Sequence, residues 1–149
     1  MPNSTAPTLV RLDWTNSFGP TSRQVLAAGH AAYGFVEAAN LGVAPHLIEV
    51  SLHQVLDDAR YWVENNTYPP DELAVRFHHR LVSVHPFPNG NGRWSRLAAD
   101  VLIVQLGSQR FTWGAADLQT AGTARTAYIA ALQAADNHDL GPLIAFARS

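Results

Sequence analysis

The spacing of apolar residues in the second half of the sequence is the feature that most constrains the fold. From Ile48 to Trp62, apolar side chains recur after four, three, four and three residues, which places them on one face of an amphipathic helix. The residues that share this face are Ile48, Leu52, Val55, Ala59 and Trp62. The asparagines and prolines of ENNTYPP end this helix, because they cannot continue it.

Further helical segments follow along the chain. Pro70 and the acidic pair Asp71 and Glu72 suit the first turn of a helix that ends near Val84. Its buried face carries Leu73, Phe77 and Leu81. The next segment, SRLAADVLIVQLGS, is apolar on nearly all sides, which predicts a helix central to the fold that stops at Gly107.

The end and the beginning of the chain complete an all-α prediction. Two closing helices are expected on Ala124, Tyr128, Leu132 and Ala135, and on Leu140, Leu143, Ile144 and Ala147. The aromatic run QRFTWG before them favours an extended segment, and a further helix is expected from Thr21. The piece from Phe35 to Pro45, with Asn40 and Gly42, predicts a turn or a short β-hairpin. We therefore expect about six helices with one minor hairpin, in a single domain over residues 21–149 after a loose arm at 1–20.

Composition excludes several classes of protein. The 149 residues suit one domain, and a net charge of −2 argues against a nucleic-acid binder. The absence of cysteine excludes a disulfide framework and a thiol nucleophile. Since neither a signal peptide nor an apolar run of membrane-spanning length is evident, we expect no membrane association and a cytoplasmic location.

The stretch HPFPNGNGRWSR, between two predicted helices, carries the candidate chemistry. Small residues from Asn89 to Gly92 tolerate unusual backbone angles and can aim successive N–H groups at one anion, beside the positive end of the helix expected near Arg93. Arg93 and Arg96 lie three residues apart and can both bind phosphate oxygens. His85 can move a proton near neutral pH. A glycine-rich loop alone is usually only a turn, but the joint pattern predicts a phosphate site beside a general base.

The same stretch resembles the signature of the Fic (Fic/Doc) family, HPFx(D/E)GNGRxxR. The matching positions are His85, Pro86, Phe87, Gly90, Asn91, Gly92, Arg93 and Arg96, and Asn89 stands at the acidic position. Residues 41–149 are also similar to a short bacterial subgroup labelled mobile mystery protein B. The resemblance implies a Fic-fold helical bundle with a β-hairpin flap.

The resemblance also implies an activity, the transfer of AMP from ATP onto a hydroxyl of a target protein. His85 would be the general base, with Arg93 as a second catalytic residue. The expected nucleotide- and phosphate-binding residues are Asn89, Gly90, Asn91, Gly92, Arg93 and Arg96. Phe87 would anchor the loop. Gly92 favours nucleotidyl transfer, because Doc-type kinases of this family carry lysine there.

Asn89 is the main departure from the family. The acidic residue at this position binds Mg²⁺ in the family, and a neutral amide oxygen offers the metal less than a carboxylate. We therefore expect Mg²⁺ to be bound weakly through Asn89 and the substrate phosphates.

Two further departures keep other functions open. Trp94 is either packed at a helix start or forms an aromatic wall for a substrate, and the expected flap at 34–43 is short. With Asn89, these features suit a Fic-fold enzyme acting on a small metabolite. A non-catalytic nucleotide- or partner-binding module is the third hypothesis.

Regulation and metal binding elsewhere complete the expectations. No glutamate follows Ser or Thr at the spacing of the family's inhibitory motif, so any inhibitor would be a separate chain. The adjacent residues His78 and His79 cannot easily share one metal ion, because neighbours on a helix diverge by about 100°. Two alternatives stay open: one of the two histidines lines the cleft, or, as we favour, one lies at the edge of the core and the other in solvent.

Overall fold

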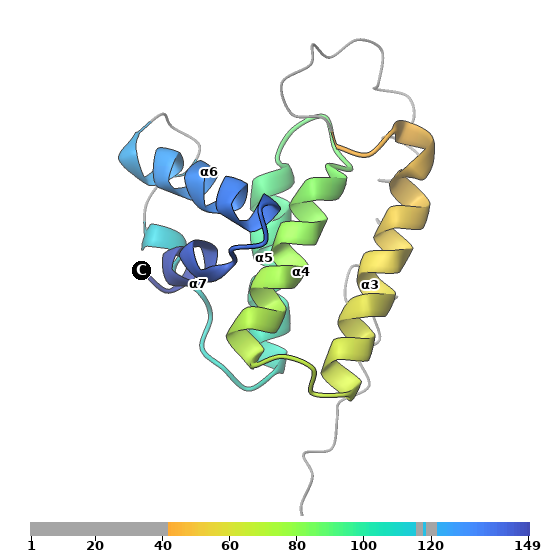
Figure 1. Cartoon of the computed structure of the whole chain (residues 1–149), viewed down its shortest axis with the longest axis horizontal. Coiled ribbons are helices and arrows are strands. Elements are labelled where there is room, and N and C mark those ends of the chain that lie inside the picture. The colour runs from red at the N-terminus through yellow and green to blue at the C-terminus, as the bar shows by residue number, and fades with distance from the viewer. Residues whose placement is uncertain (1–41, 116–117, 119–121) are drawn as a thin grey trace, which may run out of the picture. The chain divides into compact units, whose positions relative to one another are not determined.

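The computed structural model describes residues 42–115, 118 and 122–149. These residues form five α-helices, labelled as in Figure 1. The helices are α3 (Ile48–Glu64), α4 (Pro70–Val84), α5 (Asn91–Gln105), α6 (Thr123–Asp136) and α7 (Gly141–Arg148). Two 3-10 turns, Pro45–Leu47 and Trp113–Ala115, complete the regular structure, and no strand occurs among the described residues.

The all-α prediction is therefore confirmed for this part of the chain. The described residues hold five α-helices where about six were expected for the whole domain. The expected arm, the helix from Thr21 and nearly all of the hairpin expected at 34–43 lie outside the described residues. Only Gly42 and Val43 of that segment are described, and neither is in a strand.

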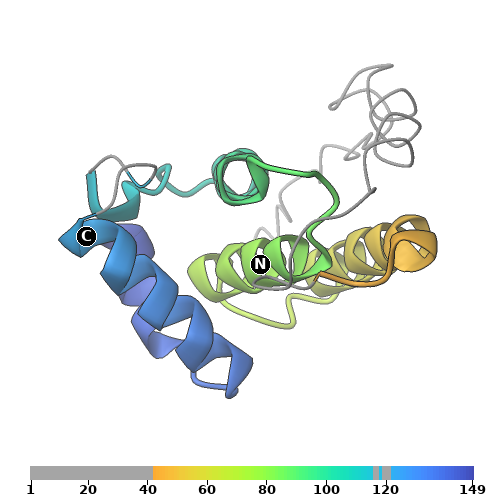
Figure 2. The same cartoon turned by 90° about the horizontal axis from the view of Figure 1, so that it is seen from above.

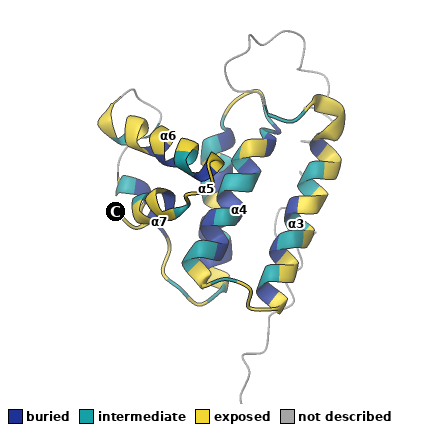
Figure 3. Ribbon diagram, in the orientation of Figure 1, coloured by how far each residue is buried: buried dark blue, intermediate teal, exposed yellow. Residues whose placement is uncertain are grey.

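Helices α3 and α4 form an antiparallel pair, side by side in Figure 1. Helix α3 buries Ile48, Val55, Ala59 and Val63, whereas Leu52 and Trp62 of the predicted stripe are half-buried. Helix α4 begins at Pro70, whose missing N–H costs nothing in a first turn. Its buried face includes the predicted Leu73, Phe77 and Leu81. Figure 3 shows these buried surfaces on the sides where the helices meet.

Helix α4 also packs against α5, which is only partly the central helix that the sequence predicts. One side of α5 is fully buried, with Ala99, Leu102 and Ile103 inaccessible to solvent. On the other side Leu97 and Val104 are 56% and 53% exposed, so the expectation of burial on nearly all sides is wrong for the described structure. Gly107, at φ 82°, ends the segment as predicted.

Helices α6 and α7 pack against each other, and α7 also contacts α4. Figure 2 shows α5 nearly end-on and α6 lengthwise, so the two helices cross steeply. The buried residues of this side form one apolar cluster that includes Ala74, Val75, Ala99, Ile103, Phe111, Trp113, Tyr128, Ala131, Ala135, Leu143 and Ala147. None of the helices in the described ranges combines the length and apolar character needed to cross a bilayer.

The run QRFTWG is not extended throughout, because its last two residues belong to a 3-10 turn. Trp113 enters a 3-10 turn, and its indole Nε1 donates a 2.9 Å hydrogen bond to the buried carboxylate of Asp100. Arg110 Nε donates to the other Asp100 oxygen at 2.8 Å. A charge that is almost buried, at 4% exposure, needs such partners, and the two bonds tie this segment to α5.

Replacing Leu143 with Ala tests the packing of α7. This side chain has no solvent exposure, so its truncation should lower the free energy of unfolding by about 2–5 kcal/mol. Leu97→Ala is the matched control, because that leucine is largely exposed. Urea unfolding followed by circular dichroism measures both, and an equal loss in the two variants would contradict the packing.

Candidate active site

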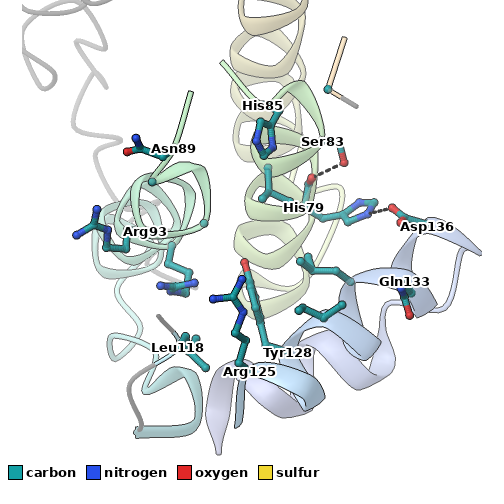
Figure 4. Close-up of a pocket in the computed structure, with 17 residues that line it drawn as sticks. His79, Ser83, His85, Asn89, Arg93, Leu118, Arg125, Tyr128, Gln133 and Asp136 are labelled. Carbon is teal, nitrogen blue, oxygen red and sulfur yellow. Dashed lines mark hydrogen bonds and ion pairs between the residues drawn. The ribbon is translucent and has the colours of Figure 1, made fainter. Parts of the chain in front are cut away.

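A cleft of about 890 Å³ lies between α4, α5 and α6, beside the loop that joins α4 to α5. Figure 4 shows His85 at the end of α4, with Arg125 and Tyr128 projecting from α6 toward the same space. The sequence-predicted residues that line the cleft are His85, Asn89, Gly90, Gly92, Arg93 and Arg96. Phe87, Asn91 and Trp94 are described but are not among its lining residues.

The loop is bounded by two residues in the left-handed backbone region. His85 caps the C-terminus of α4 at φ 53° and ψ 57°, and Gly90 caps the N-terminus of α5 at φ 76°. Glycine adopts this conformation without strain, whereas histidine does so less often. The left-handed turn ends α4 directly at the residue whose imidazole faces the cleft.

Asn91 shapes the loop with its side chain. Its Oδ1 accepts a hydrogen bond from the Phe87 N–H at 2.9 Å, and its Nδ2 donates to the Phe87 carbonyl at 2.7 Å. The residue is 2% exposed, and both ends of its amide are engaged. The Asn91 side chain is therefore occupied in holding the loop, while its backbone N–H belongs to the first turn of α5.

Helix α5 begins at Asn91, two residues before the start that the sequence predicts. The first intrahelical bond runs from the Trp94 N–H to the Gly90 carbonyl at 3.0 Å. The N–H groups of Asn91, Gly92 and Arg93 precede it, and an α-helix offers such groups no partner within itself. No side-chain cap bonds to this end of α5, which leaves it suited to an anion.

Gly92 keeps a space open beside these N–H groups. A Cβ atom on this residue would lie 3.2 Å from Arg96 Nη1 and 3.6 Å from Tyr128 Oη. A longer side chain would point at the same two groups. Glycine therefore suits this position because of its small size, since its φ is not in the left-handed region.

The two motif arginines do not lie together. Arg96 is half-buried, and its guanidinium carbon stands 5.2 Å from the centre of the Tyr128 ring. Arg93 is exposed. Figure 4 shows Arg93 and Asn89 on the side of the α5 turn that faces away from Tyr128. Arg96 is thus held over the floor of the cleft, whereas Arg93 lies at its rim.

Phe87 and Trp94 pack against each other at the base of the loop. Their ring centres are 5.2 Å apart in an edge-to-face arrangement. This contact agrees with the anchoring role expected for Phe87. It gives Trp94 a packing role, since that residue is not part of the described lining of the cleft.

Gly42 is a contact residue of the loop that the sequence did not single out. A Cβ atom there would come within 2.4 Å of His85 Cβ and 2.6 Å of the Val84 carbonyl oxygen. The adjacent Val43 N–H donates to that same carbonyl at 3.3 Å. The chain before α3 therefore touches the end of α4, and only glycine allows so close an approach to His85.

Tyr128 and His78 form a buried pair beneath the cleft. The Tyr128 hydroxyl and His78 Nε2 share a hydrogen bond of 3.0 Å, and the imidazole packs at a tilt against Trp113, with the ring centres 4.7 Å apart. Burial lowers the pKa of His78 to about 3; the Ser95 backbone opposes this shift and the charge of Arg96 adds to it. His78 is therefore neutral in the folded protein at physiological pH.

The same burial affects the phenol. It raises the pKa of Tyr128, and the guanidinium of Arg96 opposes the shift. The phenol therefore stays protonated and shares its hydrogen bond with a neutral imidazole. His78 is accordingly a core residue, as one of the two adjacent histidines was expected to be.

His79 follows the less favoured alternative, in which one of the two histidines lines the cleft, and not the favoured one, in which it faces solvent. It lines the cleft, and its Nε2 lies 2.7 Å from Asp136 Oδ1 on α6. Arg125 also lines the cleft from α6. The sequence offered no signal for Arg125 and Asp136, because α6 lies some thirty residues after the motif and its position is set by tertiary packing.

The side chains at the cleft do not make a carboxylate site for Mg²⁺. Asn89 presents a neutral amide, and Asp136 is the single acidic residue among the described residues that line the cleft. The described ranges contain no group of three or more His, Cys, Asp or Glu side chains arranged to hold a metal ion. A divalent ion would thus depend mainly on oxygens supplied by a ligand.

Asn91→Ala tests the two hydrogen bonds by which the Asn91 side chain holds the loop. The change leaves the partly buried N–H and carbonyl of Phe87 without these partners, which should lower the free energy of unfolding by about 1–3 kcal/mol. Asn89→Ala, a change at an exposed position of the same loop, should alter it by about 0.5 kcal/mol or less. Chemical unfolding compares the two variants, and equal effects would show that the Asn91 side chain does not hold the loop.

His78→Gln tests the buried imidazole through pH. Because the folded pKa is about 3 and the ordinary value is 6.5, the unfolded chain takes up a proton first as pH falls. Stability is thus retained above pH 6.5 and lost toward pH 3, by up to about 1.4 kcal/mol per pH unit. The variant should be less stable at pH 7 but should show a shallower loss between pH 6.5 and 4. Parallel pH profiles for the two proteins would contradict the burial.

Comparison with known proteins places the loop in a wider group. A family model described as "Fic/DOC family" matches residues 21–103, which include the whole loop and most of α5. Protein adenylyltransferase fic-1 of Caenorhabditis elegans is 31% identical over 107 residues, covering 70% of this chain and 19% of the relative.

Two other relatives match shorter stretches. Protein adenylyltransferase and cysteine protease IbpA of Histophilus somni is 28% identical over 77 residues, covering 52% of this chain and 2% of its own length. Protein adenylyltransferase Fic of Drosophila mojavensis is 41% identical over 44 residues, covering 30% of this chain and 9% of its own length. The chain thus spans less than a fifth of these curated relatives. The narrower likeness to the mobile mystery protein B subgroup stays a prediction.

Proposed function

Since the chain belongs to the Fic/DOC family, we propose that it transfers a nucleoside monophosphate, with AMP from ATP favoured, onto a hydroxyl group of a target protein. The observation that carries the proposal is the meeting of His85 with Gly92, Arg96 and the N-terminus of α5 in one cleft. A proton acceptor and an anion site thus face the same space. The names of the matching adenylyltransferases agree with this activity.

The first turn of α5 is the proposed phosphate site. The N–H groups of Asn91, Gly92 and Arg93 would donate to phosphate oxygens, and the helix dipole would add to the attraction. Arg96 would neutralise charge from the floor of the cleft, and Arg93 from its rim. The absence of a side chain on Gly92 supports nucleotidyl transfer, because a lysine there would point at Arg96 and Tyr128.

His85 is the proposed general base. Its imidazole would take the proton from the attacking hydroxyl, whose oxygen forms a bond to the α-phosphorus. The bond from that phosphorus to the oxygen bridging the β-phosphate breaks, and pyrophosphate leaves. The close approach of Gly42 to His85 Cβ limits where the ring can lie. Positioning of this kind contributes to catalysis because it holds the acceptor in a productive geometry.

An apolar surface formed by side chains of α4 and α6 is the proposed binding surface for the nucleoside. Val82 of α4 and Ile129 and Leu132 of α6 bring apolar side chains to the cleft, beyond the cationic end. Ile129 is 41% exposed, so its side chain is accessible to a ligand in the cleft. A flat base could cover these side chains while the polyphosphate lies at α5.

Mg²⁺ is part of the family expectation, but the residues present do not fit a protein-held magnesium site. Asn89 would offer one amide oxygen, and the nucleotide phosphates would have to supply the rest. A bound ion would neutralise phosphate charge. The proposed proton transfer to His85 and the proposed phosphate binding at α5 do not depend on this ion.

A second candidate, a Fic-fold enzyme that acts on a small metabolite, is favoured by Asn89. Without the acidic side chain, the loop lacks the charge with which the family binds its metal, so a reaction other than nucleotidyl transfer could use His85 and the anion site. Turnover of a phosphorylated or carboxylated metabolite without nucleotide would favour this candidate. Nucleotide binding without turnover would instead favour a binding module.

His85→Ala tests the proposed base. Wild-type protein incubated with ATP and lysate should add the mass of one AMP to itself or to a lysate protein. The variant should lose about 100-fold or more of that activity, the usual contribution of a general base. Peptide mass spectrometry gives the adduct and its site, and parallel incubations with GTP, CTP and UTP identify the nucleotide.

His53→Ala is the matched control, because His53 is exposed on α3 and bonds to the carbonyl of Glu49 in its own helix. It should retain wild-type activity. Full transfer by the His85→Ala protein would rule out the proposed mechanism.

A further inference from the structure

The charges that line the cleft are strongly unbalanced. Arg93, Arg96 and Arg125 contribute three guanidinium groups, although the whole chain has a net charge of −2. The one acidic side chain among the described lining residues, Asp136, already contacts His79 at 2.7 Å. This excess of fixed positive charge exceeds what the family motif alone would bring, because Arg125 belongs to α6.

We propose that Arg96 and Arg125 form a two-arginine clamp for a polyphosphate chain, which lets this protein bind its nucleotide without a divalent metal ion. The proposal rests on the proposed function, since it assigns the charge that the nucleotide phosphates meet. It departs from the family expectation, in which an acidic side chain and Mg²⁺ serve at this loop. With Asn89 at the acidic position, the loop lacks both the carboxylate and the magnesium ion that the carboxylate would bind. Arg125 supplies one additional positive charge in their place.

The two arginines approach the same feature from different helices. Arg96 on α5 lies 5.2 Å from the centre of the Tyr128 ring. Figure 4 shows Arg125 beside Tyr128, with both side chains extending from α6 into the cleft. Tyr128 is only one turn from Arg125 on the same helix. The two arginines therefore reach the same aromatic side chain from two different helices (Figure 4).

The floor between them is held rigidly. The Tyr128 hydroxyl is bound to the fully buried His78, and the Tyr128 ring packs against Phe146 of α7 at 5.7 Å. Since His78 stays neutral, it adds no repulsion of its own toward the nearby guanidinium of Arg96. A cation held over a fixed ring has less freedom to lose when a ligand binds.

The composition of the loop explains why a metal is not needed. A carboxylate at position 89 would repel a polyphosphate unless a divalent ion lay between them, whereas the amide of Asn89 does not. Guanidinium groups bind phosphate oxygens through two parallel hydrogen bonds and stay charged at all physiological pH values. The described cleft thus offers fixed cations in place of a metal site.

Calorimetry of the full chain tests the clamp with two probes, ATP and inorganic tripolyphosphate. Each is titrated at one ionic strength, once with Mg²⁺ and once with EDTA. Wild-type protein should bind both probes, with dissociation constants that differ by no more than about threefold between the two conditions. Arg125→Gln should weaken binding of both probes in EDTA by about tenfold or more.

Three variants keep the test specific. Arg60→Gln makes the same change of charge on α3, where Arg60 contacts Asp57, and should bind like wild type. Arg125→Lys retains the charge and should recover part of the affinity. Asn89→Asp should weaken ATP binding in EDTA by about tenfold and should regain it in Mg²⁺, because a metal is then needed between two anions.

The outcomes separate the clamp from the proposed function. Binding of ATP by wild type only in Mg²⁺, or equal affinities for Arg125→Gln and Arg60→Gln, would overturn the clamp while nucleotide transfer stands. Binding of tripolyphosphate but not ATP would support the clamp and overturn the proposed nucleotide transfer. Binding of neither probe would overturn both.

Discussion

The paired hydrogen bonds between the Asn91 side chain and the Phe87 backbone are the interaction on which the site depends. They close the loop over one turn, so that α4 ends in a left-handed residue, His85, and α5 begins six residues later. Because α4 and α5 pack along their length, the position of this loop is fixed by the core below it. A proton acceptor and the positive end of a helix are thereby held at one edge of a cleft.

Contacts of Tyr128 in the core fix the floor of the cleft, on the side opposite this loop. Tyr128 is rooted in the core through His78 and Phe146, and it presents its ring to Arg96. The neutral imidazole of His78 is essential to this arrangement, because a charged one would add to the cationic side chains nearby. The cationic character of the cleft thus comes from arginines over an apolar and aromatic floor. Such a floor excludes water and strengthens the attraction for an anion.

The sequence predicted what depends on local periodicity and motif spacing. The apolar stripe from Ile48 identified α3, and the helices carrying Tyr128 and Leu143 were placed correctly, because their faces repeat every three or four residues. Contacts between distant segments could not be read in the same way. Gly42 against His85 and His79 beside Asp136 depend on how helices cross, and the exposure of Leu97 depends on which neighbours α5 has.

The same division holds for the motif itself. Its spacing placed His85 and Arg96 in one site, yet it gave no sign that the Asn91 side chain is consumed by the loop or that Arg93 lies at the rim. Nor could it show that α6 adds Arg125.

The most direct test of the phosphate site is a titration of ¹⁵N-labelled protein with ATP, followed by amide NMR shifts. We expect the largest shifts at Gly90, Asn91, Gly92 and Arg93, where the first turn of α5 leaves its N–H groups without partners inside the helix. Shifts confined to residues outside the cleft, such as those on the exposed side of α3, would contradict a phosphate site at this helix end.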